Sequence, residues 1–153
     1  MNVQPNSSAP SNSTASRRRD SGAAERTVSG KFRRSSKLLR HADFQRVYKL
    51  GRRHFGTHMT VFYLKREVIQ AACIRSADGP RIGFTVGRVL GGAVDRNRIK
   101  RRMREAVRAN LGVLTAPVDV VINPKKSART ADLTLLRDEV ARAFTVMQEK
   151  CSA

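Results

Sequence analysis

The sequence predicts an α+β fold, a two-layer sandwich in which helices pack on a mixed β-sheet in the order αβββαβα. Two observations carry this prediction. In several stretches apolar residues recur every three or four positions, which is typical of amphipathic helices. Between these stretches lie short runs rich in β-branched and aromatic residues, bounded by glycine and proline, which are typical of strands.

The chain divides into a tail and one domain. Residues 1–30 are mostly Ser, Asn, Pro, Ala and Arg with almost nothing to bury, so we expect a disordered basic tail. Residues 31–150 carry the apolar patterns and are expected to form the domain. No apolar run approaches the roughly 18 residues that span a bilayer, and the start has no secretory signal. We therefore expect a cytoplasmic protein without a membrane partner.

The first predicted element is a short helix of about ten residues, with apolar side chains at helical spacing and a glycine that ends it: Phe44, Val47, Tyr48, Leu50 and Gly51. Three strand-like runs follow, at residues 57–65, 68–74 and 81–86. In the first run, residues alternate between the two faces of the sheet.

The central prediction is the helix in residues 91–111, GGAVDRNRIKRRMREAVRANL, which begins with Asp95 at or near its N-cap. Its apolar residues form one stripe, which we expect to be buried: Ile99, Met103, Ala106 and Val107. A second stripe, roughly opposite the first, is polar and basic: Asn97, Arg101, Arg104 and Arg108, with Lys100 beside it. Residues 96–108 contain seven basic side chains and a single acid, Glu105.

The last two elements are a strand and a helix. Residues 118–123 are mostly β-forming apolar residues and lie between two prolines, which predicts a strand covered on both faces. The final helix has Asp132 near its N-terminus, where an acid favours the helix dipole, and an apolar stripe at helical spacing: Leu133, Leu136, Val140, Phe144 and Met147.

The charge of the chain predicts a polyanionic partner. It has 31 Lys and Arg against 12 Asp and Glu, a formal net charge of +19, and an isoelectric point near 11.6. A basic helix is often only a solvated face, but self-repulsion of this size destabilises a domain that has no polyanion nearby. The phosphate backbone of a nucleic acid is the natural complement.

Metal and disulfide chemistry are not expected. Cys73 and Cys151 are far apart in no ligand-like spacing, so they are read as free thiols. His54 and His58 would share a face only on a helix, whereas Gly56 and the β-branched residues around them favour a strand. We therefore predict no metal site in the chain.

The run AVDRNRIKRRMRE, preceded by RIGFTV and a Gly-Gly turn, resembles the Arg-Asn-Arg signature of the bacterial ribonuclease P protein subunit. The motif places Asn97 between two arginines, followed by Lys100, Arg101 and Arg104. The resemblance covers about residues 37–147. It implies a left-handed crossover between the strands that flank the basic helix, where the general rule for such units predicts a right-handed one.

The resemblance also implies a function. The chain would be the protein subunit of ribonuclease P, an endoribonuclease that removes the 5′ leader of precursor tRNA. Its implied partners are the catalytic RNA of ribonuclease P and precursor tRNA, and no small-molecule substrate is implied. The RNA subunit carries the chemistry and holds most of the Mg²⁺, so no catalytic and no metal-binding residue is expected in the protein.

Two RNA-binding surfaces are implied. The first is the basic helix with one neighbouring cation: Arg88, Arg96, Asn97, Arg98, Lys100, Arg101, Arg104 and Arg108. The second is a shallow cleft for the single-stranded leader, lined by Phe44, Tyr48 and Phe62, whose rings would stack on unpaired bases. The alternative is that these aromatics are core residues. Tyr63 competes with Phe62, because a one-residue shift of register exchanges their faces.

One departure from the family pattern stands before the glycine turn. Where the family commonly has Ser-Lys-Lys, this chain has Gly87, Arg88 and Val89, which keeps one cation and loses another.

Two rival functional classes also remain. A general RNA-binding or ribosomal-type protein explains the charge but not the motif centred on Asn97, and a protein-only nuclease needs clustered carboxylates, whereas the acids here are few and scattered.

Overall fold

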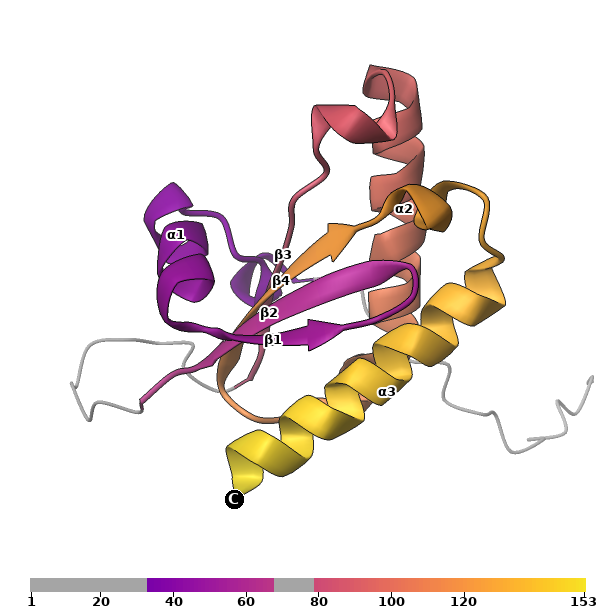
Figure 1. The fold of residues 1–153 in the computed structure, drawn as a ribbon. Helices are drawn as coiled ribbons and strands as arrows, with labels where there is room; N and C mark the ends of the chain where they lie inside the picture. Colours follow the sequence, from indigo (N-terminus) through magenta and orange to yellow (C-terminus); the bar gives the residue numbers. More distant parts are fainter. Residues whose placement is uncertain (1–32, 68–78) are drawn as a thin grey trace, which may run out of the picture.

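The computed structural model describes residues 33–67 and 79–153 (Figure 1). The predicted tail, the predicted strand at 68–74 and Cys73 lie outside the described residues. The helices and strands are α1 (His41–Leu50), β1 (Arg52–Phe55), β2 (Met59–Lys65), β3 (Arg81–Phe84), α2 (Ala93–Asn110), β4 (Val118–Pro124) and α3 (Leu133–Ser152). Short 3₁₀ turns lie between them, among them η2 (Arg88–Leu90) and η4 (Lys126–Arg129).

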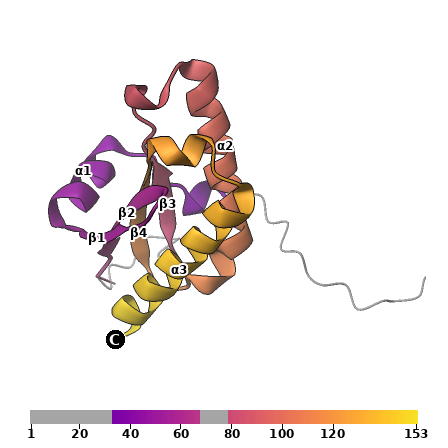
Figure 2. The same cartoon turned by 45° about the vertical axis from the view of Figure 1, so that its right-hand side comes forward.

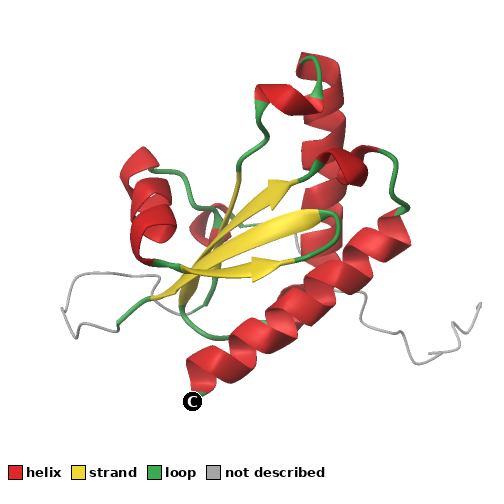
Figure 3. Cartoon of the chain, in the orientation of Figure 1, coloured by secondary structure: helices red, strands yellow, loops and turns green. Residues whose placement is uncertain are grey.

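The strands form one mixed sheet in the order β1-β2-β4-β3 (Figure 3). β1 pairs with β2, and β2 with β4, in antiparallel fashion, whereas β3 and β4 are parallel neighbours. The connection between these parallel strands contains α2. The α+β class and the mixed sheet are confirmed, and the hand of the crossover stays a prediction. The strand β1 was not predicted as a separate element.

Helices lie on both faces of the sheet (Figure 2). α2 and α3 pack on one face over the main core, which includes Val61, Val120 and Phe144. α1 packs on the other face, where Val47 lies against Val121 in a smaller cluster. A two-layer sandwich, as predicted, would have its helices on one face of the sheet, and this part of the prediction is wrong for α1. The physical reason is β4, which is apolar and buried on both faces and so needs cover on both.

The alternation of β2 decides which aromatic lies on which face. Tyr63 is 3% exposed and belongs to the main core under α3. Phe62 is half-buried and packs in the α1 cluster. Their partners in β4, Val121 for Phe62 and Val120 for Tyr63, divide between the same two clusters. The choice that the sequence leaves open is thus resolved for the sheet: Phe62, and not Tyr63, lies on the face of α1.

The entry into α2 depends on one glycine. Gly91 has φ +120°, a conformation that residues with a side chain rarely adopt. A Cβ built on it would lie 2.7 Å from Asp95 Oδ2. Asp95 lies in the first turn of the helix and pairs with Arg129 of η4 at 3.3 Å. This turn therefore fixes where the basic helix begins.

Candidate RNA interface

The basic helix α2 divides into two faces as its sequence predicts. The four apolar residues of the first stripe are buried: Ile99, Met103, Ala106 and Val107. The opposite side is exposed, and we define the basic stripe as Asn97, Arg98, Arg101, Arg104 and Arg108. Arg96 and Lys100 are half-buried at its margins, and Arg88 is exposed in η2 before the helix. The predicted RNA-binding residues of this helix therefore share a solvent-facing side or its edges.

Arg102 is the basic residue of α2 with a structural role. Its guanidinium donates to the carbonyl oxygens of Ala128 at 3.2 Å and Arg129 at 3.1 Å, and also to that of Ala131. These carbonyls end the η4 turn, so Arg102 fastens α2 to the loop that follows β4. The helical pattern alone does not distinguish Arg102 from its neighbours.

The two acids of α2 pair with arginines of other elements. Glu105 accepts a hydrogen bond from Arg137 of α3 at 2.7 Å. Asp95, as described above, pairs with Arg129. Both acids of the helix are therefore engaged by arginines of other elements, which leaves the positive field of the basic stripe uncompensated by its own helix.

The three predicted aromatics come together on the α1 face, and we call Phe44, Tyr48 and Phe62 the aromatic cluster. All three are half-buried and pack against the smaller apolar cluster. The rings of Tyr48 and Phe62 meet edge to face, with centroids 4.8 Å apart. The aromatics are therefore neither core residues nor free surface side chains, since each keeps part of its ring in reach of solvent.

Packing of a ring against the backbone of β3 and hydrogen bonds to a hydroxyl hold the aromatic cluster in place. The Phe44 ring covers Gly83 of β3, where an added Cβ would lie 2.5 Å from the ring. The Tyr48 hydroxyl donates to Asn123 Oδ1 at 2.8 Å and is hydrogen-bonded to Thr85 Oγ1 at 2.9 Å. Tyr48 is thereby attached to the ends of β3 and β4, and the rings are preorganised rather than mobile.

The aromatic cluster and the basic stripe meet at one cavity. This cavity, of about 220 Å³, lies where α1, β3 and α2 approach one another. Its lining includes the aromatic rings of Phe44 and Phe84 and the cations Lys100 and Arg104. Cations beside partly exposed rings are a combination that binds unpaired nucleotides, since rings stack on bases and cations neutralise phosphates.

An arginine cluster under α1 was missed in the sequence. Asp119 of β4 is fully buried and accepts two hydrogen bonds of 2.7 Å from Arg81. Arg66 and Arg46 approach the same carboxylate at 3.3 and 3.4 Å. Hydrogen bonding to Asp119 raises the pKa of Arg81, whereas burial lowers the pKa of Arg66. The sequence feature that could have indicated this cluster is the single acid, Asp119, within an otherwise apolar strand, because a buried carboxylate needs cationic or hydrogen-bonding partners.

Arg53 is a second residue that sequence reasoning missed. Its guanidinium carbon lies 5.3 Å from the centroid of the Phe62 ring, and its side chain is exposed on β1. Such a cation over an aromatic face is stabilising and places positive charge beside a stacking surface. The exposed pattern of β1 offered no signal for this contact.

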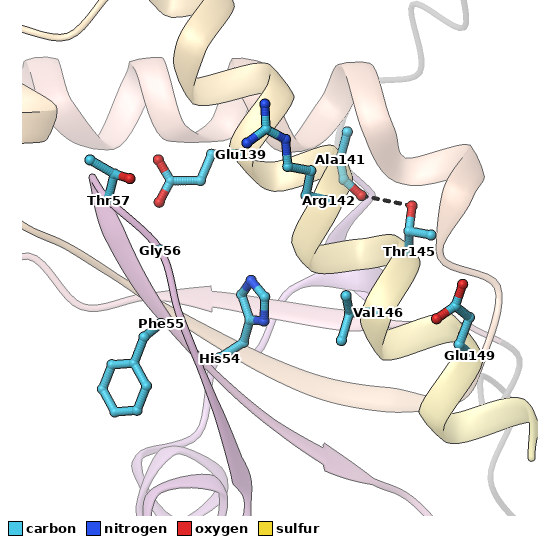
Figure 4. A pocket seen from close by; sticks show the side chains of 10 residues that line it. All are labelled: His54, Phe55, Gly56, Thr57, Glu139, Ala141, Arg142, Thr145, Val146 and Glu149. Atoms are coloured by element: carbon cyan, nitrogen blue, oxygen red, sulfur yellow. Dashed lines mark hydrogen bonds between the residues drawn. The ribbon is translucent and has the colours of Figure 1, made fainter.

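A larger cavity, of about 770 Å³, lies apart from this interface between β1 and α3 (Figure 4). Its lining carries charges of both signs, Glu139, Arg142 and Glu149 among them. Across residues 33–67 and 79–153, no group of three His, Cys, Asp or Glu side chains is placed to hold a metal ion. In the same residues, no helix has the length and apolar character needed to cross a membrane.

Comparisons with known proteins decide the family. The family model for ribonuclease P matches residues 32–148, which include every element named above up to the last turn of α3. The chain belongs to the ribonuclease P protein family. The ribonuclease P protein component of Acidothermus cellulolyticus is 37% identical over 106 residues, covering 69% of this chain and 82% of the relative. That of Finegoldia magna is 36% identical over 108 residues, covering 71% and 85%.

Solved structures of ribonuclease P proteins share the fold. The Staphylococcus aureus protein aligns with a TM-score of 0.61 at 25% identity, covering 74% of this chain and 95% of that one. The Thermotoga maritima protein aligns with a TM-score of 0.61 at 26% identity, covering 72% and 96%. The resemblance carried by the Arg-Asn-Arg motif is thus confirmed, and as a ribonuclease P protein component the chain works in tRNA processing with an RNA partner.

Proposed function

We propose that this ribonuclease P protein binds the catalytic RNA with the basic stripe of α2 and holds the 5′ leader of precursor tRNA on the aromatic cluster. The observation that supports this most is the cavity in which Phe44 lies beside Lys100 and Arg104. It joins the two surfaces, and the described residues that line it include no acid, so a strand of RNA bound to the basic stripe could continue to Phe44. The leader then adds affinity for precursor over mature tRNA.

We also assign the chemistry of cleavage to the RNA subunit, where bound Mg²⁺ would supply an activated water for hydrolysis of the phosphodiester. The acids of β4 and α2 do not fit a Mg²⁺ site. Asp119 is surrounded by arginines, and Asp95 and Glu105 are each paired with one. The residues of this chain therefore bind and orient RNA and neutralise phosphate charge near the cleavage site.

A reconstituted cleavage assay tests the division of labour. Precursor tRNA is incubated at low Mg²⁺ with the cognate RNA subunit, with the protein, and with both. We expect no cleavage by the protein alone and faster cleavage by the pair than by the RNA alone. Cleavage by the protein in the absence of RNA would overturn the assignment and favour a protein-only nuclease.

The salt dependence of binding tests the basic stripe. Arg101→Ala and Arg104→Ala should each lower the slope of log K against log salt by about one unit, because each removes one phosphate contact. Arg142→Ala is the matched control, since Arg142 is exposed on α3 away from this surface. If the slope stays the same in all three variants, the basic stripe is only a solvated face and the protein binds RNA elsewhere.

A further inference from the structure

Phe55, the last residue of β1, is an exposed aromatic that the proposed function does not yet use. It is 69% exposed. Phe55 pairs with Thr60 in the antiparallel register, and paired residues project to the same face of a sheet. Thr60 alternates with the buried Val61 of the main core, so Phe55 lies on the α1 face, as Phe62 does. Figure 4 shows the two directions, with His54 toward α3 and Phe55 away from it.

The hairpin that carries Phe55 is held firmly in place. The Glu139 carboxylate accepts hydrogen bonds from the backbone N–H groups of His58 at 2.9 Å and Met59 at 3.2 Å. Lys125 Nζ donates to the Gly56 carbonyl at 2.6 Å, and Ser127 Oγ donates to the Thr57 carbonyl at 3.2 Å. An apolar ring is thus presented to solvent on a fixed support, which favours binding because little conformational entropy is lost.

The surroundings of Phe55 have the chemistry of a site for single-stranded RNA. Phe55 and Phe62 are diagonal neighbours on one face, a relation that places Cβ atoms roughly 7 Å apart. Two exposed cations lie near the ring. Arg53 is two residues before Phe55 on the same strand, and Lys125 is hydrogen-bonded to the backbone carbonyl of Gly56, the residue after Phe55. Hydroxyl and amide groups lie further along the same face, at Thr60, Thr85 and Asn123.

We propose that Phe55 is a further stacking site, which binds an unpaired nucleotide of the leader beyond the one held at Phe62. The inference rests on the proposed function, because it extends the same RNA-binding face. Phe55 supplies the ring on which the base stacks, and Arg53 and Lys125 neutralise the phosphates on either side. The site is continuous with the aromatic cluster, and its charge is complementary to RNA and not to a basic protein surface.

The test uses the holoenzyme, reconstituted from the full chain and the cognate RNA subunit, and measures Kd for precursor tRNAs whose leader is shortened one nucleotide at a time. With the native protein, affinity should rise with leader length to a plateau. Phe55→Ala should weaken binding about five- to tenfold for long leaders only, so that the plateau is reached at a shorter leader. Phe55→Leu, which keeps apolar surface but has no ring, should behave like Phe55→Ala, and Phe55→Tyr should behave like the native protein.

The matched control is Leu135→Ala, which removes an apolar side chain that is 51% exposed on α3. This variant should bind every precursor like the native protein. An unchanged leader-length profile in Phe55→Ala, while Phe62→Ala still loses leader-dependent affinity, would overturn the inference and leave the proposed function standing. If neither variant alters the profile, the leader assignment of the whole face is wrong.

A protein partner for this face is a separate outcome of the same variants. Sedimentation of the free chain and of the holoenzyme shows whether Phe55→Ala changes the state of association. A shift toward smaller species with an unchanged leader-length profile would make Phe55 a protein contact and overturn the inference. The same association state in both proteins, together with a shortened plateau, supports the nucleotide site.

Discussion

Phe62 and Tyr63 are adjacent in β2 but lie on opposite faces of the sheet, so substitutions at the two positions should separate RNA binding from stability. Phe62 is half-buried against Tyr48, with Arg53 over its ring. Tyr63 is 3% exposed in the main core. Phe62→Ala should weaken the binding of leader-bearing precursor, whereas Tyr63→Ala should mainly destabilise the fold.

The magnitudes follow from burial. Removing a buried aromatic side chain costs about 3–5 kcal/mol, which is the loss of stability expected for Tyr63→Ala. Phe62 is only half-buried, so the loss of apolar burial in Phe62→Ala should cost about half as much stability. Losing the ring contacts with Tyr48 and Arg53 brings the expected decrease in unfolding free energy to about 2–3 kcal/mol. On the RNA side, one lost stack costs about 1–3 kcal/mol, a factor of about 5 to 150 in Kd.

The assay is a pair of binding constants, for precursor and mature tRNA, measured on variants shown by urea unfolding to be folded. Phe62→Leu is included because it keeps apolar contact, and such swaps cost less than about 1.5 kcal/mol of stability. We expect Phe62→Ala and Phe62→Leu to lose affinity for precursor but not for mature tRNA. Tyr63→Phe, which keeps the buried ring, should lose neither. Equal losses on both RNAs for the Phe62 variants would show that the ring does not contact the leader.

Three further predictions concern buried charge and titration. Asp119→Asn should lower the free energy of unfolding by about 3 kcal/mol, since three arginines lose their shared carboxylate; a change below about 1 kcal/mol in urea unfolding would contradict the role given to this cluster. Arg102→Ala should cost about 1–3 kcal/mol of stability through its hydrogen bonds to η4 but leave the salt slope of RNA binding unchanged, the reverse of Arg101→Ala. Burial raises the pKa of the Cys151 thiol and of the Tyr63 phenol, so between the unfolded and the folded pKa of each group the folded state retains a proton that the unfolded state has lost. The contribution of these two groups to stability should therefore be constant below about pH 8.5 and fall as the pH rises from there through the folded pKa values, and Cys151→Ala should lessen the first part of this fall in urea unfolding across alkaline pH.

The sequence was sufficient to predict an element and its buried face where the apolar residues recur with a regular period. The two stripes of α2 follow from a helical period that persists for five turns, and Ile99 and Met103 are buried as that period requires. The Arg-Asn-Arg motif then distinguished this helix from an ordinary basic one. The α1 helix and its end at Gly51 were likewise readable from local signals.

The sequence was insufficient to predict the structure where pairing between residues far apart in the chain determines it. β1 is a strand because it pairs with β2, although its residues, Arg52–Phe55, show no apolar alternation. The faces of Phe62 and Tyr63 depend on the register with β4, which two adjacent aromatics leave undetermined. Asp119 obtains its arginines from three separate segments, so its local sequence contains no sign of them.

The hydrogen bonds of Tyr48 have a consequence for the order of folding during synthesis. They join α1 to Thr85, 37 residues further along the chain, and to Asn123, 75 residues further along. Contacts of such sequence separation form late, because the intervening chain must first be ordered. A nascent chain that has emerged only as far as α2 thus presents the basic stripe before β4 is available to position the aromatic rings. Under the proposed function, non-specific attraction to RNA would precede leader binding, because the aromatic rings are positioned only in the completed sheet.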